Sequence, residues 1–175
     1  MIKTREIIQK QKVNILLYRL AHQLYEKYKD FHNTSIIALQ PRGTKFGRVF
    51  VRVLSEITQK KIEYGELDIT LFRDDFGRGN TPLIPSITDI DFQIEGKNII
   101  LIDDVLYTGR SVRAAMEAIN SMGRPAKMEL LVLIDRRFNR EIPIQPDYVG
   151  EEVDTRANDK VKVDMLKPNV IIETQ

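Results

Sequence analysis

The sequence predicts an α/β fold with a central, mostly parallel sheet flanked by helices. Short apolar runs that end in polar residues recur at residues 35–39, 99–102 and 129–134. Such β-branched runs are typical of strands buried on both faces of a parallel sheet. A glycine-containing turn and a helix-forming segment follow the first two runs, which is the order of a strand–turn–helix unit.

The composition is that of one soluble domain spanning residues 1–175. The net charge of +2 provides no general attraction to nucleic acid or to a membrane. The absence of cysteine excludes disulfides and thiolate metal sites. No apolar run approaches the length of a membrane span, and the first residues lack the apolar core of a signal peptide. We therefore expect a cytoplasmic protein with no membrane partner.

The N-terminal segment, residues 3–29, predicts one long amphipathic helix or two shorter ones. Arg19, His22, Glu26 and Lys29 follow one another at spacings of three or four residues on one face, and from spacing alone this face is a solvated surface. The opposite, apolar face would be formed by Val13, Leu16, Leu17, Leu20, Leu24 and Tyr28.

Residues 35–39 predict a buried strand that ends in the turn Gln40-Pro41-Arg42-Gly43. A helix is expected over residues 45–60, with Thr44 as its N-cap. Arg42 could bind a pyrophosphate through two parallel hydrogen bonds. The alternative is a plain strand-to-helix turn with a surface arginine, and the residues by themselves favour neither.

The middle of the chain changes character after a third predicted strand at residues 62–71. Residues 73–91 contain several glycines, prolines and charges. Such a long segment inside a compact domain is often an active-site lid, and a disordered surface loop is the alternative for residues 77–81.

The stretch of nine residues from Asp103 to Ser111 carries the most chemistry. Two carboxylates follow the strand at residues 99–102, and a glycine turn then leads into a helix expected to end at Met122. The free N–H groups at the start of a helix attract an anion, and Gly109 lets the backbone close around a phosphate. Thr108 adds a hydroxyl donor, as does Ser111.

Paired carboxylates would repel a bare phosphate but would accept hydrogen bonds from sugar hydroxyls. The expected ligand therefore carries both a phosphate and hydroxyls, as phosphoribosyl pyrophosphate (PRPP) does, with Mg²⁺ neutralising its pyrophosphate. The strand at residues 129–134 ends in further polar residues, where the base is expected, and three short strands are expected at residues 148–153, 160–165 and 170–173.

This stretch, Asp103 to Ser111, resembles the PRPP motif of type I phosphoribosyltransferases. Within that superfamily the sequence is similar to the pyrimidine operon attenuator proteins that are also uracil phosphoribosyltransferases. The similarity continues through residues 65–75, 112–119, 123–126, 131–136, 140–144 and 147–150.

The resemblance implies that ribose 5-phosphate passes from PRPP to uracil, giving UMP and pyrophosphate, with Mg²⁺ held mainly through PRPP and by no direct protein ligand. It also implies a UMP-responsive regulator of pyrimidine-operon mRNA that forms a homo-oligomer, a dimer or a tetramer. Tyr107 favours a pyrimidine, because purine-using relatives place an aspartate there and a tyrosine is a poor base near neutral pH.

The resemblance also assigns roles to individual residues, with residues 73–91 as a flexible hood over PRPP. The catalytic residues would be Asp103, Asp104, Arg42 and Arg73. The PRPP-binding residues would be Pro41, Arg42, Gly43, Asp103, Asp104, Val105, Leu106, Tyr107, Thr108, Gly109, Arg110 and Ser111. The base-binding residues would be Asp135, Arg136, Ile142 and Pro143, and the RNA-binding residues Arg19 and His22.

The sequence departs from the family at three places. Gln40-Pro41 replaces the usual Lys-Thr, and Arg137 replaces a glycine. Residues 151–154 are acidic where the family carries a lysine that contacts RNA, and acidic groups repel phosphate. The alternatives are an attenuator with little catalysis, or a phosphoribosyltransferase for another base without an RNA role. A receiver-type regulatory domain is disfavoured, because the carboxylate pair comes past the midpoint of the chain.

Overall fold

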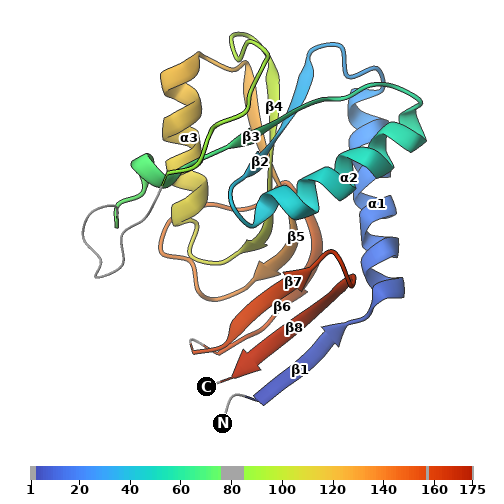
Figure 1. Ribbon diagram of the computed structural model, residues 1–175, viewed down its shortest axis with the longest axis vertical. Helices are drawn as coiled ribbons and strands as arrows, with labels where there is room; N and C mark the ends of the chain where they lie inside the picture. The colour runs from blue at the N-terminus through green and yellow to red at the C-terminus, as the bar shows by residue number, and fades with distance from the viewer. Residues whose placement is uncertain (1–2, 76–84, 157, 175) are drawn as a thin grey trace.

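The computed structural model describes residues 3–75, 85–156 and 158–174. Its elements are β1 (Lys3–Ile8), α1 (Lys10–Tyr28), β2 (Thr34–Leu39), α2 (Gly43–Thr58), β3 (Glu63–Leu67), a 3₁₀ turn η1 (Thr70–Phe72), β4 (Asn98–Leu106), α3 (Arg110–Met122), β5 (Lys127–Arg136), β6 (Tyr148–Val153), β7 (Lys160–Asp164) and β8 (Asn169–Thr174), as Figure 1 shows.

The main sheet has five parallel strands in the order β3-β2-β4-β5-β6, which confirms the α/β fold with a parallel sheet. Helices α1 and α2 cover one face and α3 covers the other (Figure 1). Strand β2 contributes to both cores, because Ile36 and Ala38 face α1 and α2 whereas Ile37 and Leu39 face α3. Burial on both faces explains why the strand is an uninterrupted apolar run.

Strands β2 and β4 are neighbours in the sheet, with β3 on the far side of β2 and β5 on the far side of β4. The connections that leave β2 and β4 therefore run in opposite directions across the sheet. Open α/β sheets bind their ligands in the crevice at such a switch point, beyond the carboxyl ends of the strands. The turn after β2 and the acidic end of β4 both lie at this crevice, so the topology brings the two predicted binding loops together.

A second sheet corrects the prediction for the N-terminus. Residues 3–8 form strand β1 and not the first turns of a helix, and β1 pairs antiparallel with β8, which pairs with β7. The helix begins only at Lys10, and its predicted apolar face is buried as expected. Pairing with a strand more than 160 residues away in sequence overrides a local pattern that allowed either structure.

Two smaller boundaries also differ from the predictions. The third strand ends at Leu67, because the Asp68 carboxylate accepts a hydrogen bond from the Thr70 backbone N–H at 2.9 Å and starts the 3₁₀ turn. Thr44 is not the N-cap of α2, which begins at Gly43 after Arg42. The Thr44 hydroxyl instead donates to the Pro41 carbonyl at 2.9 Å and tightens the turn.

Part of the predicted hood, residues 76–84, lies outside the described residues. The segment that follows runs alongside β3, where the Glu66 and Asp89 backbones exchange two hydrogen bonds of 2.8 Å. In the part of the chain that the structure describes, we find no helix with the length and apolar character needed to span a membrane.

Candidate active site

The turn after β2 packs directly against the acidic end of β4, and Gly43 is the residue that permits this approach. A Cβ atom at position 43 would lie 2.8 Å from the Ile102 carbonyl oxygen and 3.2 Å from Asp103 Oδ1. Contacts shorter than 3.0 Å to a backbone atom do not relax without moving the backbone. The arginine-containing turn and the paired carboxylates therefore form one continuous surface.

The two carboxylates at this surface are poorly solvated. Burial raises the pKa of Asp103 well above its usual range, and the neighbouring Asp104 charge raises it further. Burial also raises the pKa of Asp104, against the Val105 backbone N–H and the Arg42 charge, which lower it. Asp104 is only 7% exposed. In both residues burial therefore disfavours the ionised carboxylate.

The loop from Tyr107 to Arg110, which the sequence predicted to bind a phosphate, connects β4 to α3. Gly109 has φ +91°, a left-handed conformation that L side chains rarely adopt, and it immediately precedes α3. Among the described residues, the backbone N–H groups of Thr108, Gly109 and Ser111 donate no hydrogen bond. Val105 and Leu106 are the last residues of β4 and place this loop beside the carboxylates.

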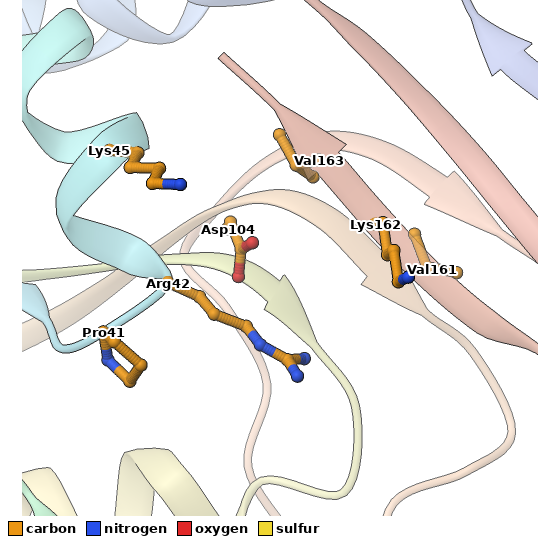
Figure 2. Close-up of a pocket in the computed structure, with 7 residues that line it drawn as sticks. All are labelled: Pro41, Arg42, Lys45, Asp104, Val161, Lys162 and Val163. Atoms are coloured by element: carbon orange, nitrogen blue, oxygen red, sulfur yellow. The ribbon is translucent and has the colours of Figure 1, made fainter. Parts of the chain in front are cut away.

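A cavity of about 310 Å³ opens between the start of α2 and strand β7 (Figure 2). Three of its lining residues, Pro41, Arg42 and Asp104, were predicted for the site. Four others were not predicted, namely Lys45, Val161, Lys162 and Val163. The β7 residues carry no local signal that could have found them, because only the second sheet brings this strand over the end of β4.

Two arginines link the end of β5 to the loop from Tyr107 to Arg110. The Arg140 guanidinium donates to the Asp135 carboxylate and to the Tyr107 carbonyl oxygen. The Arg136 guanidinium lies 3.8 Å from the centre of the Tyr107 ring, a stacking distance, and donates to Thr155 Oγ1 at 2.9 Å. Burial lowers the pKa of Arg136. Asp135 and Arg136 therefore adjoin the loop as predicted, whereas Arg140 was not predicted.

The two apolar residues predicted to bind the base, Ile142 and Pro143, lie in different places. Ile142 packs beside Gly109, since a Cβ at position 109 would lie 3.6 Å from Ile142 Cβ. Pro143 instead lines a separate cavity of about 220 Å³ between α3 and the starts of β5 and β6, together with Met116 and Leu130. The structure thus places Ile142 beside the loop from Tyr107 to Arg110, and Pro143 away from the cavity at Arg42 and Asp104.

Two predicted arginines are engaged with acidic residues of the segment before the undescribed residues 76–84. The Arg110 guanidinium pairs with Asp74 at 2.6 Å and with Glu141 at 3.3 Å. The Arg73 guanidinium pairs with Asp75 at 2.5 Å. The Arg110–Asp74 pair links residues 73–75 to the start of α3.

The predicted RNA-binding face of α1 is partly occupied by the protein itself. The Arg19 guanidinium donates to the Val149 carbonyl oxygen at 2.8 Å and also to that of Gly150. Lys12 pairs with Glu151 at 2.7 Å. His22 is exposed on the same helix. The first acidic residue of the departure at 151–154 therefore neutralises a cation of this face.

Arg137 at the end of β5 and the acidic residues 151–154 form one cluster. The Arg137 guanidinium donates two hydrogen bonds to the Asp154 carboxylate, at 2.7 and 2.8 Å, and lies 3.4 Å from Glu152. The arginine that replaces a family glycine thus compensates the acidic segment that replaces a family lysine.

A divalent cation would find oxygen donors here but few of them. The described residues contain no group of three or more His, Cys, Asp or Glu side chains arranged around a metal. The Asp103 and Asp104 carboxylates are hard oxygen donors of the kind Mg²⁺ prefers, and Mg²⁺ commonly takes one or two carboxylates together with substrate oxygens. The residues present fit that arrangement.

Comparison with known proteins gives a consistent picture. A family model described as phosphoribosyl transferase domain matches residues 3–166. "Bifunctional protein PyrR" of Desulfosudis oleivorans is 42% identical over 164 residues, which cover 93% of this chain and 90% of that protein. The protein of the same name from Acetivibrio thermocellus is 42% identical over 167 residues, covering 95% and 90%.

Solved structures share the fold at much lower identity. The hypoxanthine phosphoribosyltransferase of Trypanosoma cruzi superposes with a TM-score of 0.74 at 15% identity, covering 96% of this chain and 95% of that one. A hypoxanthine phosphoribosyltransferase from Staphylococcus aureus gives a TM-score of 0.69 at 19% identity, covering 87% and 78%.

Proposed function

This chain belongs to the phosphoribosyl transferase family, and from that membership we propose that it transfers ribose 5-phosphate from PRPP to uracil, giving UMP and pyrophosphate. We further propose that UMP controls its binding to pyrimidine-operon mRNA. The relatives that share its length and about two-fifths of its sequence are named bifunctional, which supports two roles in one chain.

One observation carries the enzymatic proposal. Paired carboxylates, the loop after β4 and Arg42 meet at the switch point of a parallel sheet. Among the described residues, three N–H groups of this loop donate no hydrogen bond and Arg42 makes no ion pair. A carboxylate pair attracts hydroxyls and cations, whereas the loop attracts an anion. A phosphorylated sugar satisfies both halves of this site, because its ring hydroxyls and its terminal phosphate are separated by the length of the sugar.

The residues would act by positioning and by electrostatics. Asp103 and Asp104 accept hydrogen bonds from the ribose hydroxyls and face the positive charge that grows on the sugar as its bond to pyrophosphate breaks. Arg42 stabilises the departing pyrophosphate. Mg²⁺, held mainly through PRPP oxygens, would neutralise charge on the pyrophosphate.

The base is proposed to bind near Tyr107 and the end of β5. The stacked Arg136 and the Arg140 bridge fix the backbone of this region in one conformation. A rigid wall of backbone carbonyl and N–H groups suits uracil, which presents carbonyl and N–H groups of its own. Tyr107 has no carboxylate that could accept a purine ring proton, in agreement with a pyrimidine substrate.

The proposed RNA role is supported by the relatives' name and by exposed His22. It is limited by the hydrogen bonds of Arg19 to β6 and by the ion pair of Lys12 with Glu151. Filter binding with pyrimidine-operon leader RNA, with and without UMP, tests it. If the Arg19→Ala and His22→Ala variants bind RNA as well as the unaltered protein, this face of α1 has no part in binding.

The decisive experiment incubates the protein with uracil, PRPP and Mg²⁺ and measures UMP and pyrophosphate. Hypoxanthine, guanine and adenine serve as competing bases, and Asp104→Asn serves as the variant that should lose turnover while keeping its circular dichroism spectrum. Formation of UMP only from uracil supports the proposal, and no product at high protein concentration would refute it. Light scattering of the same sample tests the proposed homo-oligomer, a dimer or a tetramer.

A further inference from the structure

Lys45 lies in the first turn of α2 and lines the same cavity as Arg42 and Asp104. Figure 2 shows its side chain extending from the helix toward the space that the Asp104 carboxylate faces. Within residues 3–75, 85–156 and 158–174 its ammonium group makes no hydrogen bond or ion pair. Hydrogen bonds from the Lys167 and Leu166 backbones lower the pKa of Asp164, and the charge of Lys45 is a lesser cause in the same direction. Its charge is therefore available to a ligand.

The preceding turn, residues 40–43, is short of positive charge. Gln40, at the start of this turn, is neutral. Its side-chain amide donates to the Ile87 carbonyl oxygen at 2.7 Å, so it holds the returning segment and is not free to bind a ligand. Arg42 is the one cationic residue of this turn.

The backbone around Lys45 also favours an anion. In the described part of the chain, the N–H groups of Gly43, Thr44 and Lys45 donate no hydrogen bond. Asp104, more than nine-tenths buried, faces the same cavity and would repel an anion unless cations lie between them. A highly charged group entering this cavity therefore needs more than one positive side chain.

We propose that Lys45 binds the pyrophosphate group of PRPP, and the pyrophosphate product, from the first turn of α2, and that its charge adds to that of Arg42 in the preceding turn. This inference rests on the proposed function, since it names a further binding residue of the same site. Lys45 and Arg42 approach the group from the helix, and the N–H groups of the turn approach it along the helix axis.

The test measures binding of pyrophosphate in the presence of Mg²⁺ by isothermal titration calorimetry. Lys45→Gln removes the charge and keeps the length, and we expect its dissociation constant to rise about tenfold, the lower end of what a hydrogen bond to a charged group contributes. Lys45→Arg keeps the charge and should bind within about threefold of the unaltered protein. Lys60→Gln makes the same charge change just beyond the far end of α2 and should leave the constant unaltered.

Steady-state kinetics provide a second measurement. Lys45→Gln should raise the KM for PRPP about tenfold and leave the KM for uracil within twofold. Thermal unfolding checks that each variant is folded, which is expected because Lys45 is exposed.

The outcomes separate this inference from the proposed function. If the unaltered protein forms UMP and binds pyrophosphate, but Lys45→Gln binds it equally well, the role of Lys45 is refuted and the function stands. If Lys60→Gln weakens binding as much as Lys45→Gln, the effect is one of net charge and the inference is also refuted. If the unaltered protein neither binds pyrophosphate nor forms UMP, the proposed function fails and the inference fails with it.

Discussion

Glu129 at the start of β5 offers a quantitative test of how α1 is attached to the sheet. Its carboxylate is 2% exposed and accepts hydrogen bonds from the hydroxyls of Tyr28 at 2.6 Å and Tyr148 at 2.8 Å. It also pairs with the ammonium groups of Lys27 and Lys127. Burial alone would raise the pKa of Glu129, but the bonds from these four side chains outweigh burial and lower it to about 2.

The perturbation is Glu129→Gln, which keeps the size and one oxygen acceptor but removes the charge. A fall in pKa from 4.5 to about 2 corresponds to about 3.4 kcal/mol of stability near neutral pH. Lys27 and Lys127 are 44% and 51% exposed, so solvent screens part of this interaction. We therefore expect a loss of about 2 kcal/mol, which lowers the Tm of a protein of this size by about 6 °C.

The pH dependence distinguishes a charge effect from a packing effect. Because the pKa of Glu129 is lower in the folded protein, its stabilisation is complete above the ordinary value of 4.5 and is lost as the pH falls toward 2. The difference in unfolding free energy between the two proteins should be constant from pH 7 to 5.5 and fall to less than half by about pH 3.

Urea unfolding followed by circular dichroism at pH 7, 5.5, 4 and 3 makes this measurement. The control is Glu117→Gln on α3, where the carboxylate pairs with Arg113 and is 58% exposed. We expect the control to change stability by less than about 0.5 kcal/mol. A Glu129→Gln protein as stable as the unaltered one at pH 7, or a deficit that does not shrink in acid, would show that the reasoning is wrong.

Three further predictions concern the candidate active site. Asp103→Asn should lower UMP formation at least about 100-fold, yet raise the Tm at pH 8 and leave it little changed at pH 4. The pKa of Asp103 is raised by burial and by Asp104, so its ionised form costs stability only above the ordinary pKa; a lower Tm at pH 8 would contradict this. Gly43→Ala should raise the KM for PRPP about tenfold or more, because the new Cβ lies 2.8 Å from the Ile102 carbonyl oxygen and must push the turn from the carboxylates; unchanged kinetics would show that the turn yields freely. Arg140→Ala should raise the KM for uracil more than that for PRPP, since it frees the Tyr107 carbonyl oxygen, and equal effects on both would place Arg140 outside the base site.

The sequence predicted the elements that depend on neighbours along the chain. The strand at residues 99–102 and the helix that ends at Met122 follow from local apolar patterns, and both are present. The strand end was predicted too early, because β4 runs on to Leu106 and contains the two carboxylates. The acidic tip and the left-handed Gly109 follow from residue chemistry at a strand end. The resemblance to a family added uracil as the expected base, which no periodicity could have supplied.

The N-terminal strand shows where local patterns fail. Residues 3–8 have a sequence compatible with helix or strand, and the choice is made by pairing with β8 at the other end of the chain. The same pairing carries β7 over the end of β4 and creates one wall of the cavity at Asp104. No window of the sequence contains both partners.

The sequence by itself determined the parallel sheet, the order of its binding loops and the carboxylate pair, because strand burial, turns and helix starts are set by residues within about one element's length. The tertiary structure alone decided which charges are free. It turned Arg19 to the carbonyl groups of β6, paired Arg137 with Asp154 and left Lys45 facing the cavity with no partner among the described residues. Those outcomes depend on distances between segments far apart in the chain, which only the packing of helices on the sheets fixes.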